Sequence, residues 1–370
     1  MAKTFKKLVK EHEGFHVPQY EIEIGPPSGS LKILPQKDYP VLSITVNQSV
    51  GPASSAQIAF ICRYDFKESD FEEDIYDMLK PGKFVEIKLG YKKMKTVFAG
   101  ILAAINTSFT PSGVIVSVTC YDAKMALFYN RCWRGFKEPK TIKEVIQEVL
   151  KPCEQYVDVK VTGLAFDDAI EPGQITAMFQ DNIDDYKYIM RLAELTNSSF
   201  YTDADKIYFT ENLMETADAV VELGWGDGLM SFSVDIDISG QVGSVEIAYR
   251  TGARKDEYLT FDGSDIKGKG DLPNEAGDVV EEKSVELTET KVWNEKQAKL
   301  LAKSKFLKSV MNYVTGKGST IGIPEIKAGT AIELDGLGEK LNGKYFLGQV
   351  THQFDAGGYL TNFTCQRAKI

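Results

Sequence analysis

Hydrophobic and polar residues alternate along most of this chain with a period of two, the pattern of half-buried β-strands. Turns rich in glycine separate the alternating runs. Such runs predict strands over residues 20–24, 31–34, 41–46 and 56–60, and two more within 229–249 that meet at Ser239-Gly240. The pattern therefore predicts a mainly β protein.

A few segments change to the helical period. Thr141 and Glu144 have the spacing of a capping box, and the apolar stripe that follows them stops at Pro152. A second helix is predicted over residues 185–196, where Asn197 can adopt the left-handed conformation that closes a helix. Further helices are expected over residues 3–11, 71–79 and 293–311. A hairpin is predicted over residues 200–209.

Two stretches far apart in the chain, residues 80–125 and 327–370, are similar to each other. The matched residues are Gly82 with Gly329, Glu86 with Glu333, Phe98 with Phe346, Gly100 with Gly348, Gly113 with Gly358, Thr119-Cys120 with Thr364-Cys365, and Ala123-Lys124 with Ala368-Lys369. Each stretch consists of alternating runs separated by turns that contain glycine. The similarity predicts a duplicated β-module.

These patterns predict mainly β structure with α+β insertions, in which two related β-barrel domains accompany a small α+β domain. The expected divisions are an N-terminal extension at 1–17, a first β-barrel domain at 18–125, the α+β domain at 126–225 and a second β-barrel domain at 226–370. Residues 251–289 are polar, glycine-rich and acidic. They predict a long surface loop or a partly disordered segment within the second barrel domain, before the helix at about 293–311.

Composition excludes several classes of function. A length of 370 residues allows two or three domains, and a net charge of −10 argues against nucleic-acid binding as the main task. No apolar run is long enough to span a membrane, and the charged N-terminus is unlike a signal peptide, so we expect synthesis in the cytoplasm. The five cysteines form no CxxC pair and are expected to be reduced and mostly buried. Four lysines (Lys88, Lys92, Lys93 and Lys95) are interpreted as a solvated hairpin edge.

The segment from His12 to His16 spells HExxH, which on a helix can bind zinc with Glu13 as general base. Here Gly14 weakens the required helix and Pro18 ends it. The third histidine, His352, lies in a predicted strand far along the chain. We interpret the motif as coincidental, in a terminal segment outside any predicted core.

Other candidate chemistry is also weak. Neighbouring carboxylates occur at Asp65 with Glu68 and Asp70, at residues 72–74, at Asp184-Asp185, and at Asp235 with Asp237. General acid–base catalysis needs two carboxyls that face each other across a cleft, and no such pairing can be inferred. Residues 316–320 (GKGST) lack the first glycine of a phosphate-binding loop and follow a helix. We therefore expect no catalytic, cofactor-binding or metal-binding residues, and no enzyme activity.

Residues 180–209, QDNIDDYKYIMRLAELTNSSFYTDADKIYF, resemble the signature of the phage late control D family, the baseplate hubs of contractile tails and related injection systems. The hub half of type VI secretion spike proteins belongs to the same superfamily. The matching residues are Gln180, Asn182, Asp185, Tyr186, Arg191, Leu192, Ala193, Glu194, Tyr201, Asp203 and Phe209. The resemblance covers most of residues 40–250 and 293–370, although Asn197 stands where the family tends to have glycine.

The resemblance implies a homotrimer whose six β-barrel domains form a pseudo-sixfold ring between the central spike and the tail tube. Expected partners are a spike protein on a separate chain, tube or tube-initiator proteins and baseplate wedge proteins, in a tail or tail-like particle. The chain ends at Ile370, whereas many relatives continue into an OB-fold and a β-helical spike, which we expect to be absent or on another polypeptide. The resemblance also implies structural roles for the helix at 185–196: Tyr186, Ile189 and Leu192 anchor it, and Arg191 with Glu194 form an ion pair or an interface contact.

Two alternatives remain open: a tail-associated hydrolase that degrades cell wall, and a free β-rich binding module that forms no ring.

Overall fold

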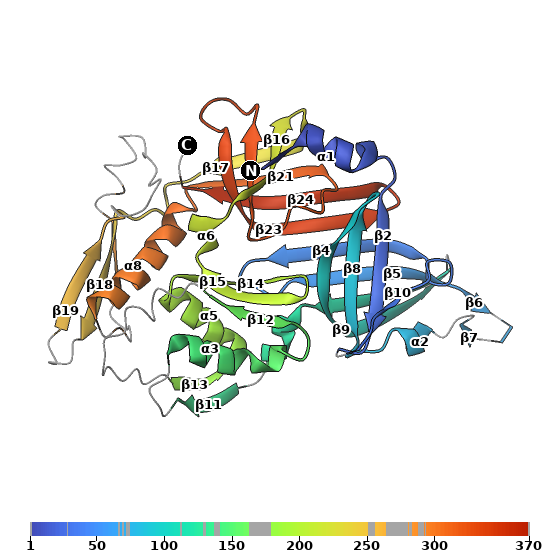
Figure 1. The fold of residues 1–370 in the computed structure, drawn as a ribbon, viewed down its shortest axis with the longest axis horizontal. Coiled ribbons are helices and arrows are strands. Elements are labelled where there is room, and N and C mark those ends of the chain that lie inside the picture. The colour runs from blue at the N-terminus through green and yellow to red at the C-terminus, as the bar shows by residue number, and fades with distance from the viewer. Residues whose placement is uncertain are drawn as a thin grey trace.

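The computed structural model describes residues 2–27, 29–65, 67–68, 70–71, 75–111, 113–128, 131–136, 141–162, 179–250, 256–263, 280, 283–287, 292 and 294–368. The protein is mainly β, as the alternating pattern predicted. One sheet of fourteen strands runs through both β-domains, and the three longest described helices lie to one side of it (Figure 1). No described helix combines the length and apolar character needed to cross a bilayer.

The C-terminal part forms a closed six-stranded barrel. Around the barrel the strands are β16 (Ala219–Trp225), β17 (Gly228–Ile236), β21 (Val314–Ile321), β24 (Gly358–Arg367), β23 (Gly343–Asp355) and β22 (Ala331–Asp335), which pairs again with β16. Its inward side chains, among them Leu223, Tyr345 and Phe363, form one hydrophobic core. Because successive residues of a strand face opposite sides, the alternation along these strands places polar residues outside.

The N-terminal β-domain contains seven paired strands. Their order in the sheet is β4 (Val41–Ser49), β5 (Ser55–Cys62), β10 (Gly113–Tyr121), β9 (Met94–Thr110), β8 (Phe84–Gly90), β2 (Gln19–Gly25) and β3 (Lys32–Ile33). The long strand β9 pairs with β8 through its first half and with β10 along its second half. The sheet therefore folds over a core that includes Ile44, Phe60 and Ile87.

The two β-domains share one sheet because β23 pairs with β4 in an antiparallel register from Gln349 opposite Ser49 to Phe354 opposite Ile44. Figure 1 shows the red strands of the C-terminal barrel lying directly above the blue strands of the first domain. The connection between β5 and β8 carries a small hairpin, β6 (Tyr64–Asp65) with β7 (Asp70–Phe71), and helix α2 (Ile75–Met78). Of the helix predicted at 71–79, only this short segment is helical among the described residues.

The duplication is confirmed and extends further than the sequence indicated. Strands β4, β5, β10, β9 and β8 occur in the same order as β17, β21, β24, β23 and β22. Both sets carry the same two β-bulges, where one residue lies opposite no partner. The first bulge skips Ala103 in β9 and Gly348 in β23. The second skips Leu42 in β4 and Met230 in β17.

The structure corrects the alignment of the middle strands. The sequence matched two residues of each: Phe98 with Phe346, and Gly100 with Gly348. In the structure the amides of Gly82 and Gly329, both with positive φ, donate to the carbonyls of Leu102 and Leu347 at 2.8 Å. Leu102 is therefore the counterpart of Leu347. The sequence match was displaced because the β8–β9 hairpin is longer than the β22–β23 hairpin. The shared Phe-x-Gly string therefore lies earlier along β9 than along β23.

The α+β part packs beneath the first β-domain. Its helices are α3 (Ile142–Leu150) and α5 (Asp185–Leu195), and its strands are β11 (Arg131–Gly135), β12 (Asp158–Val161), β13 (Phe179–Asp184), β14 (Ser198–Asp203) and β15 (Lys206–Glu211). The predicted capping box forms, since Glu144 N donates to Thr141 Oγ1 at 3.2 Å and Thr141 N donates to the Glu144 carboxylate at 2.8 Å. Asn197 has a positive φ of 50°. The predicted helices, the left-handed cap and the hairpin at 200–209 are confirmed.

Between β17 and β21 the chain forms a separate sheet covered by a helix. The elements are β18 (Ser244–Arg250), β19 (Asp256–Phe261), β20 (Ser284–Leu287) and α8 (Glu295–Val310). The interpretation of 251–289 as a loop was wrong for β19 and β20, because Phe261 joins Val245 and Ile247 in a core beneath α8. The remaining residues of that prediction, 251–255, 264–279, 281–282 and 288–289, lie outside the described residues. The predicted helix is confirmed as α8.

The N-terminal segment packs on the C-terminal barrel. Strand β1 (Lys3–Thr4) pairs with β16, and helix α1 (Phe5–Glu11) lies beside that strand (Figure 1). The side chain of Leu8 on α1 is completely buried in the barrel core. The expectation that this segment lies outside any core was therefore wrong. Only Leu8 is fully buried there, with Phe5 and Phe15 packed partly buried against the same core, and so few apolar residues are too little signal for a sequence pattern. A second short helix, α6 (Leu213–Thr216), precedes β16.

Candidate functional site

The sheet shared by the two β-domains has one outward face covered by uncharged polar side chains. We call this surface the polar face. It comprises Ser231, Ser233, Lys317, Ser319, Asn362, Thr364, Gln349, Thr351, Gln353, Thr45, Asn47, Ser55, Gln57, Ser117 and Thr119, from β17 to β10. Among these residues only Lys317 is charged, and Asp235 of β17 lies exposed on the same side, next after Ser233 in the alternation. Since 26% of all residues are charged, most of the charge of the chain lies elsewhere.

The polar face continues without a break where the two domains join. Ser231 lies 2.5 Å from Ser319 between neighbouring strands, and Asn362 donates to Gln353 at 3.0 Å. At the junction itself Thr351 of β23 donates to Asn47 of β4 at 2.9 Å. Cross-strand contacts of this kind stabilise a sheet, so the face is built as one surface.

Behind this face the junction of the domains is buried. His352 is fully buried, and the hydroxyl of Tyr359 lies 2.9 Å from its Nδ1. Burial lowers the pKa of His352 to about 3, and the positive charge of Lys327 adds to the effect. The imidazole is therefore neutral in the folded protein near neutral pH.

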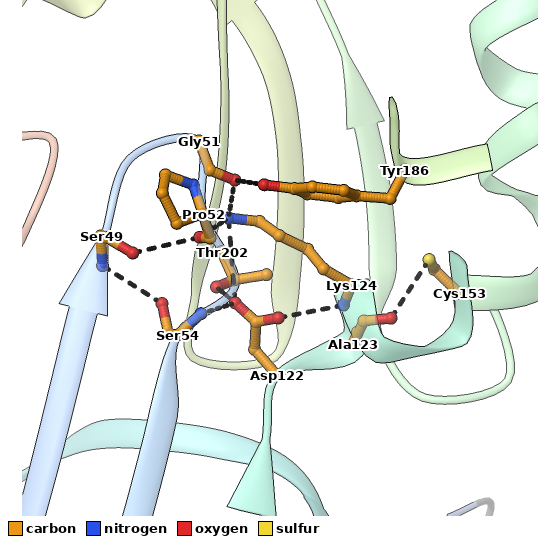
Figure 2. A network of polar contacts seen from close by, with 10 residues as sticks. All are labelled: Ser49, Gly51, Pro52, Ser54, Asp122, Ala123, Lys124, Cys153, Tyr186 and Thr202. Carbon is orange, nitrogen blue, oxygen red and sulfur yellow. Dashed lines mark hydrogen bonds and ion pairs between the residues drawn. The ribbon is translucent and has the colours of Figure 1, made fainter. Parts of the chain in front are cut away.

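A second buried junction joins the first β-domain to the α+β part, and Figure 2 shows it from close by. The side chain of Lys124 is fully buried at the end of β10. Its Nζ donates to the carbonyls of Gly51 at 3.1 Å and Pro52 at 2.8 Å, in the loop between β4 and β5. The same ammonium lies 5.1 Å from the centre of the Phe200 ring on β14.

Asp122 balances this buried charge. Its carboxylate accepts hydrogen bonds from the Ser54 amide at 2.8 Å and the Thr202 hydroxyl at 2.6 Å, and Lys124 Nζ lies 3.9 Å from Oδ2 (Figure 2). Burial lowers the pKa of Lys124, and the negative charge of Asp122 opposes that shift. Because three segments of the chain supply these groups, the network fixes how the first β-domain and the α+β part are oriented.

A third junction is centred on Glu325, in the connection between β21 and β22. His12 Nε2 lies 3.2 Å from its carboxylate, Lys95 Nζ 3.1 Å and Lys3 Nζ 3.6 Å. Burial alone raises the pKa of Glu325, but the hydrogen bond to His12 and the charge of Lys95 outweigh it and lower the pKa to about 2. The cluster connects the N-terminal segment, β9 and the C-terminal barrel.

The HExxH residues do not share a helix face. Helix α1 ends at Glu11, and Gly14 has a φ of 77°, which no continuing helix allows. His12 is buried against Glu325, whereas His16 is exposed. Across the described residues, no three His, Cys, Asp or Glu side chains are grouped as a metal site.

Several of the remaining sequence candidates cap helices or accept local hydrogen bonds, whereas Asp235 lies exposed on β17. Asp184 caps α5 by accepting from the Lys187 amide at 2.8 Å, and buried Asp185 accepts from Gln180 at 2.7 Å. Asp65 accepts from the Lys67 amide at 2.7 Å, and Asp237 from the Ser239 amide at 2.7 Å. Residues 316–320 form part of β21. Glu72, Glu73 and Asp74 lie outside the described residues.

The lysine-rich hairpin is more ordered than predicted. Lys88 pairs with Glu21 and Glu23, Lys92 with Glu13, and Lys95 with Glu325. The interpretation as a solvated edge is confirmed for Lys92 and Lys93, which are exposed. It was wrong for Lys88, which is half-buried between two glutamates, and for Lys95, which pairs with the buried Glu325. The partners of the three paired lysines come from the N-terminal segment, β2 and the loop after β21, which the sequence could not place beside them.

The helix motif at 185–195 has the structural role that the sequence indicated. Ile189 and Leu192 are buried, and the Tyr186 hydroxyl donates to the Gly51 carbonyl at 3.3 Å. The ion pair was assigned to the wrong partner, however, since Glu194 pairs with Lys305 of α8 while Arg191 is exposed. Lys305 belongs to a distant helix that no local spacing rule could find.

The sequence did contain a signal for part of this site. The repeat matched Lys124, and alternating Ser, Thr, Asn and Gln in strings such as SITVNQS and LTNFTCQ mark the polar face. Neither feature is a pair of facing charges or a nucleophile with a basic partner, so neither matches a pattern of catalytic chemistry. Glu325 carried no such signal.

Residues 32–356 of the chain match the protein family described as the Alg8 N-terminal domain. The chain belongs to the Alg8 N-terminal domain family. The match begins after β2 and ends before β24, so it spans most of both β-domains and everything between them. None of the curated proteins compared with the sequence matches it.

The fold of this member of the Alg8 N-terminal domain family is similar to that of phage tail proteins of known structure. The 43 kDa tail protein of prophage MuSo2 from Shewanella oneidensis is 13% identical, with a TM-score of 0.66 over 95% of this chain and 99% of that one. A tail protein from Neisseria meningitidis MC58 is 11% identical, with a TM-score of 0.65 over 95% and 99%.

A component of the type VI secretion system from Escherichia coli is 11% identical, with a TM-score of 0.55 over 88% of this chain and 73% of that one. The resemblance to baseplate hub proteins predicted from the sequence is thereby confirmed at the level of the fold.

Proposed function

We propose that this protein is the structural, non-enzymatic baseplate hub of a contractile phage tail or tail-like injection particle. Three copies would form a ring of six β-modules that joins the central spike to the tail tube. The tail-protein fold supports the class of particle. The observation that carries the ring is the pair of equivalent β-modules, which are joined in one continuous sheet within the chain.

The polar face is the surface that we assign to the channel of this ring. It spans both modules, so six modules would line a channel with one kind of surface. Uncharged hydroxyl and amide groups offer no strong electrostatic trap and no large apolar patch to material that passes through. Behind this surface, the Lys124–Asp122 network attaches the α+β part to the first β-domain, the Glu325 cluster attaches the N-terminal segment and β9 to the C-terminal barrel, and the neutral His352 lies where the two β-domains join.

The expected partners follow from this position. A spike protein on a separate chain would occupy one side of the ring, and tube or tube-initiator proteins the other, with baseplate wedge proteins at the periphery. The protein would be made in the bacterial cytoplasm and incorporated into the particle. The domain divisions inferred from the sequence remain part of this proposal.

The test is a map of particles from the producing strain, with the chain located between tube and spike.

A complementation experiment adds a functional measurement. Replacing Asn47 or Thr351 with Trp should leave assembly intact but block ejection, because the ring would narrow. The control Lys160→Trp lies on β12, away from the polar face, and should eject normally. Particles of normal composition that lack this chain would refute the proposal.

A further inference from the structure

The junction inside the chain reveals how two modules can bind to each other. The second half of β23 pairs with β4, where Thr351 lies opposite Asn47 and Phe354 opposite Ile44. The structural counterparts are known from the shared bulges and strand order. Residues 349–354 of β23 correspond to 104–109 of β9, and residues 44–49 of β4 correspond to 232–237 at β17.

Neither counterpart edge is occupied in the described chain. Residues 104–109 pair with β10 on one side, and no described strand pairs with their other side. Residues 231–236 pair with β21, and β16 reaches β17 only at Gly228 and Leu229. Unpaired strand edges of this kind are templates for pairing with another chain.

Side-chain exposure differs between the two modules in the way that a missing neighbour strand would produce. At the internal junction Val46 and Val350 are 0% and 1% exposed. Their structural counterparts in the other module, Val234 of β17 and Ile105 of β9, are only partly buried, and along the same two edges Phe109 is 63% exposed and Ile236 is 49% exposed. Burying such side chains stabilises an association by removing apolar surface from water.

We propose that residues 104–109 of one copy pair antiparallel with residues 232–237 of a second copy, in the register of the β23–β4 junction. This inference rests on the proposed ring and names its subunit contact. Each copy presents one edge of each kind, so the contact is heterologous and can close into a ring. The polar face then continues from one copy to the next.

The register places complementary side chains opposite each other. Asn106 lies opposite Asp235 of the second copy, as Thr351 lies opposite Asn47 within the chain, where the pair shares a 2.9 Å hydrogen bond. An amide facing a carboxylate can form the same contact. Phe109 lies opposite Phe232 of the second copy, and an aromatic pair across strands is favourable.

Disulfide capture tests this register. The variant Asn106→Cys/Asp235→Cys, with Cys62 and Cys132 replaced by Ser, should form covalent dimers and trimers of the 41.2 kDa chain under mild oxidation. Six strands of the sheet lie between β9 and β17 within one chain, far beyond the roughly 7 Å that a disulfide allows between Cα atoms. The matched control Asn106→Cys/Ser231→Cys should not cross-link. Asn47→Cys/Thr351→Cys should close within one chain and shows that the chemistry works.

Each outcome decides the inference. Covalent trimers from the test pair alone support it. A trimer by solution mass that forms no 106–235 disulfide, while the 47–351 pair closes, overturns this register and leaves the ring proposal standing. A chain that stays monomeric and uncross-linked at high concentration overturns the contact as a self-association surface. The ring proposal itself is then judged by the particle map.

Discussion

At the scale of single residues, Lys124 shows how a charge can be held without contact with solvent. Its ammonium has two carbonyl acceptors, an aromatic face and the Asp122 carboxylate. Breaking one partner of a buried pair leaves the other charge without compensation, which usually costs more than the pair itself contributes. Lys124 therefore stabilises the contact between the first β-domain and the α+β part.

We expect Lys124→Met to destabilise the protein by about 3 kcal/mol, because methionine fills the space but leaves Asp122 and two carbonyls without their donor. Denaturant unfolding measures the change. The control is Lys80→Met, which removes an exposed ion pair with Asp77 and should change stability by less than about 0.5 kcal/mol. Equal losses in the two variants would contradict the role of the buried network.

His352 makes the junction sensitive to acid. In the unfolded chain its pKa is near the ordinary value of 6.5, whereas in the folded protein it is about 3. Between these values only the unfolded state binds the proton, so the free energy of unfolding should fall as pH drops from about 6.5 toward 3. His352→Gln should flatten this part of the stability curve, while His16→Gln, at an exposed site, should not. A wild-type curve that is flat from pH 6.5 to 4 would refute the expectation.

At the scale of elements, the sequence predicted what depends on local pattern. Alternation located the strands, and caps located α3 and α5. Non-local pairing was beyond it: β19 is a strand because it pairs with β18, and the register of β9 is set by a bulge at Ala103. Leu8, together with the partly buried Phe5 and Phe15, makes the N-terminal segment part of a core. Similarly, the partners of Glu325 are more than two hundred residues away from it.

Glu325 offers a test of that last connection. Its folded pKa of about 2 lies below the ordinary 4.5, so its stabilising contribution is present above about pH 4.5 and is lost as pH falls toward 2. We expect Glu325→Gln to be less stable than the wild type at pH 7 and to approach it near pH 2. Glu13→Gln removes an exposed pair with Lys92 and should follow the wild type at every pH. A constant difference for Glu325→Gln across the pH range would contradict this account.

At the scale of the whole molecule, the duplication is the feature that sequence and structure describe together. The sequence showed the repeat only for the last three strands of each copy. Two further strands precede them, and in the second copy the inserted sheet and α8 separate these two strands, β17 and β21, from each other. Only their pairing and bulges identify them as equivalent. The site could be predicted less well than the fold, because it is a surface formed by many ordinary residues and not a motif.

The same symmetry gives a prediction for assembly. If Asn106 faces Asp235 of a neighbouring copy, Asn106→Asp places two carboxylates opposite each other, and like charges at directly opposed positions weaken pairing. We expect the affinity between copies to fall by about fivefold per contact, corresponding to about 1 kcal/mol. Adding Asp235→Asn to the same chain removes the repulsion and should restore association. The double variant has the same net charge as the wild type, because the two substitutions exchange an amide and a carboxylate. Sedimentation at several concentrations measures the effect.

The rescue is the decisive observation, because a mutation that only damaged the fold of β9 would not be repaired by a change on β17. Equal weakening in the single and double variants would mean that the two residues do not meet.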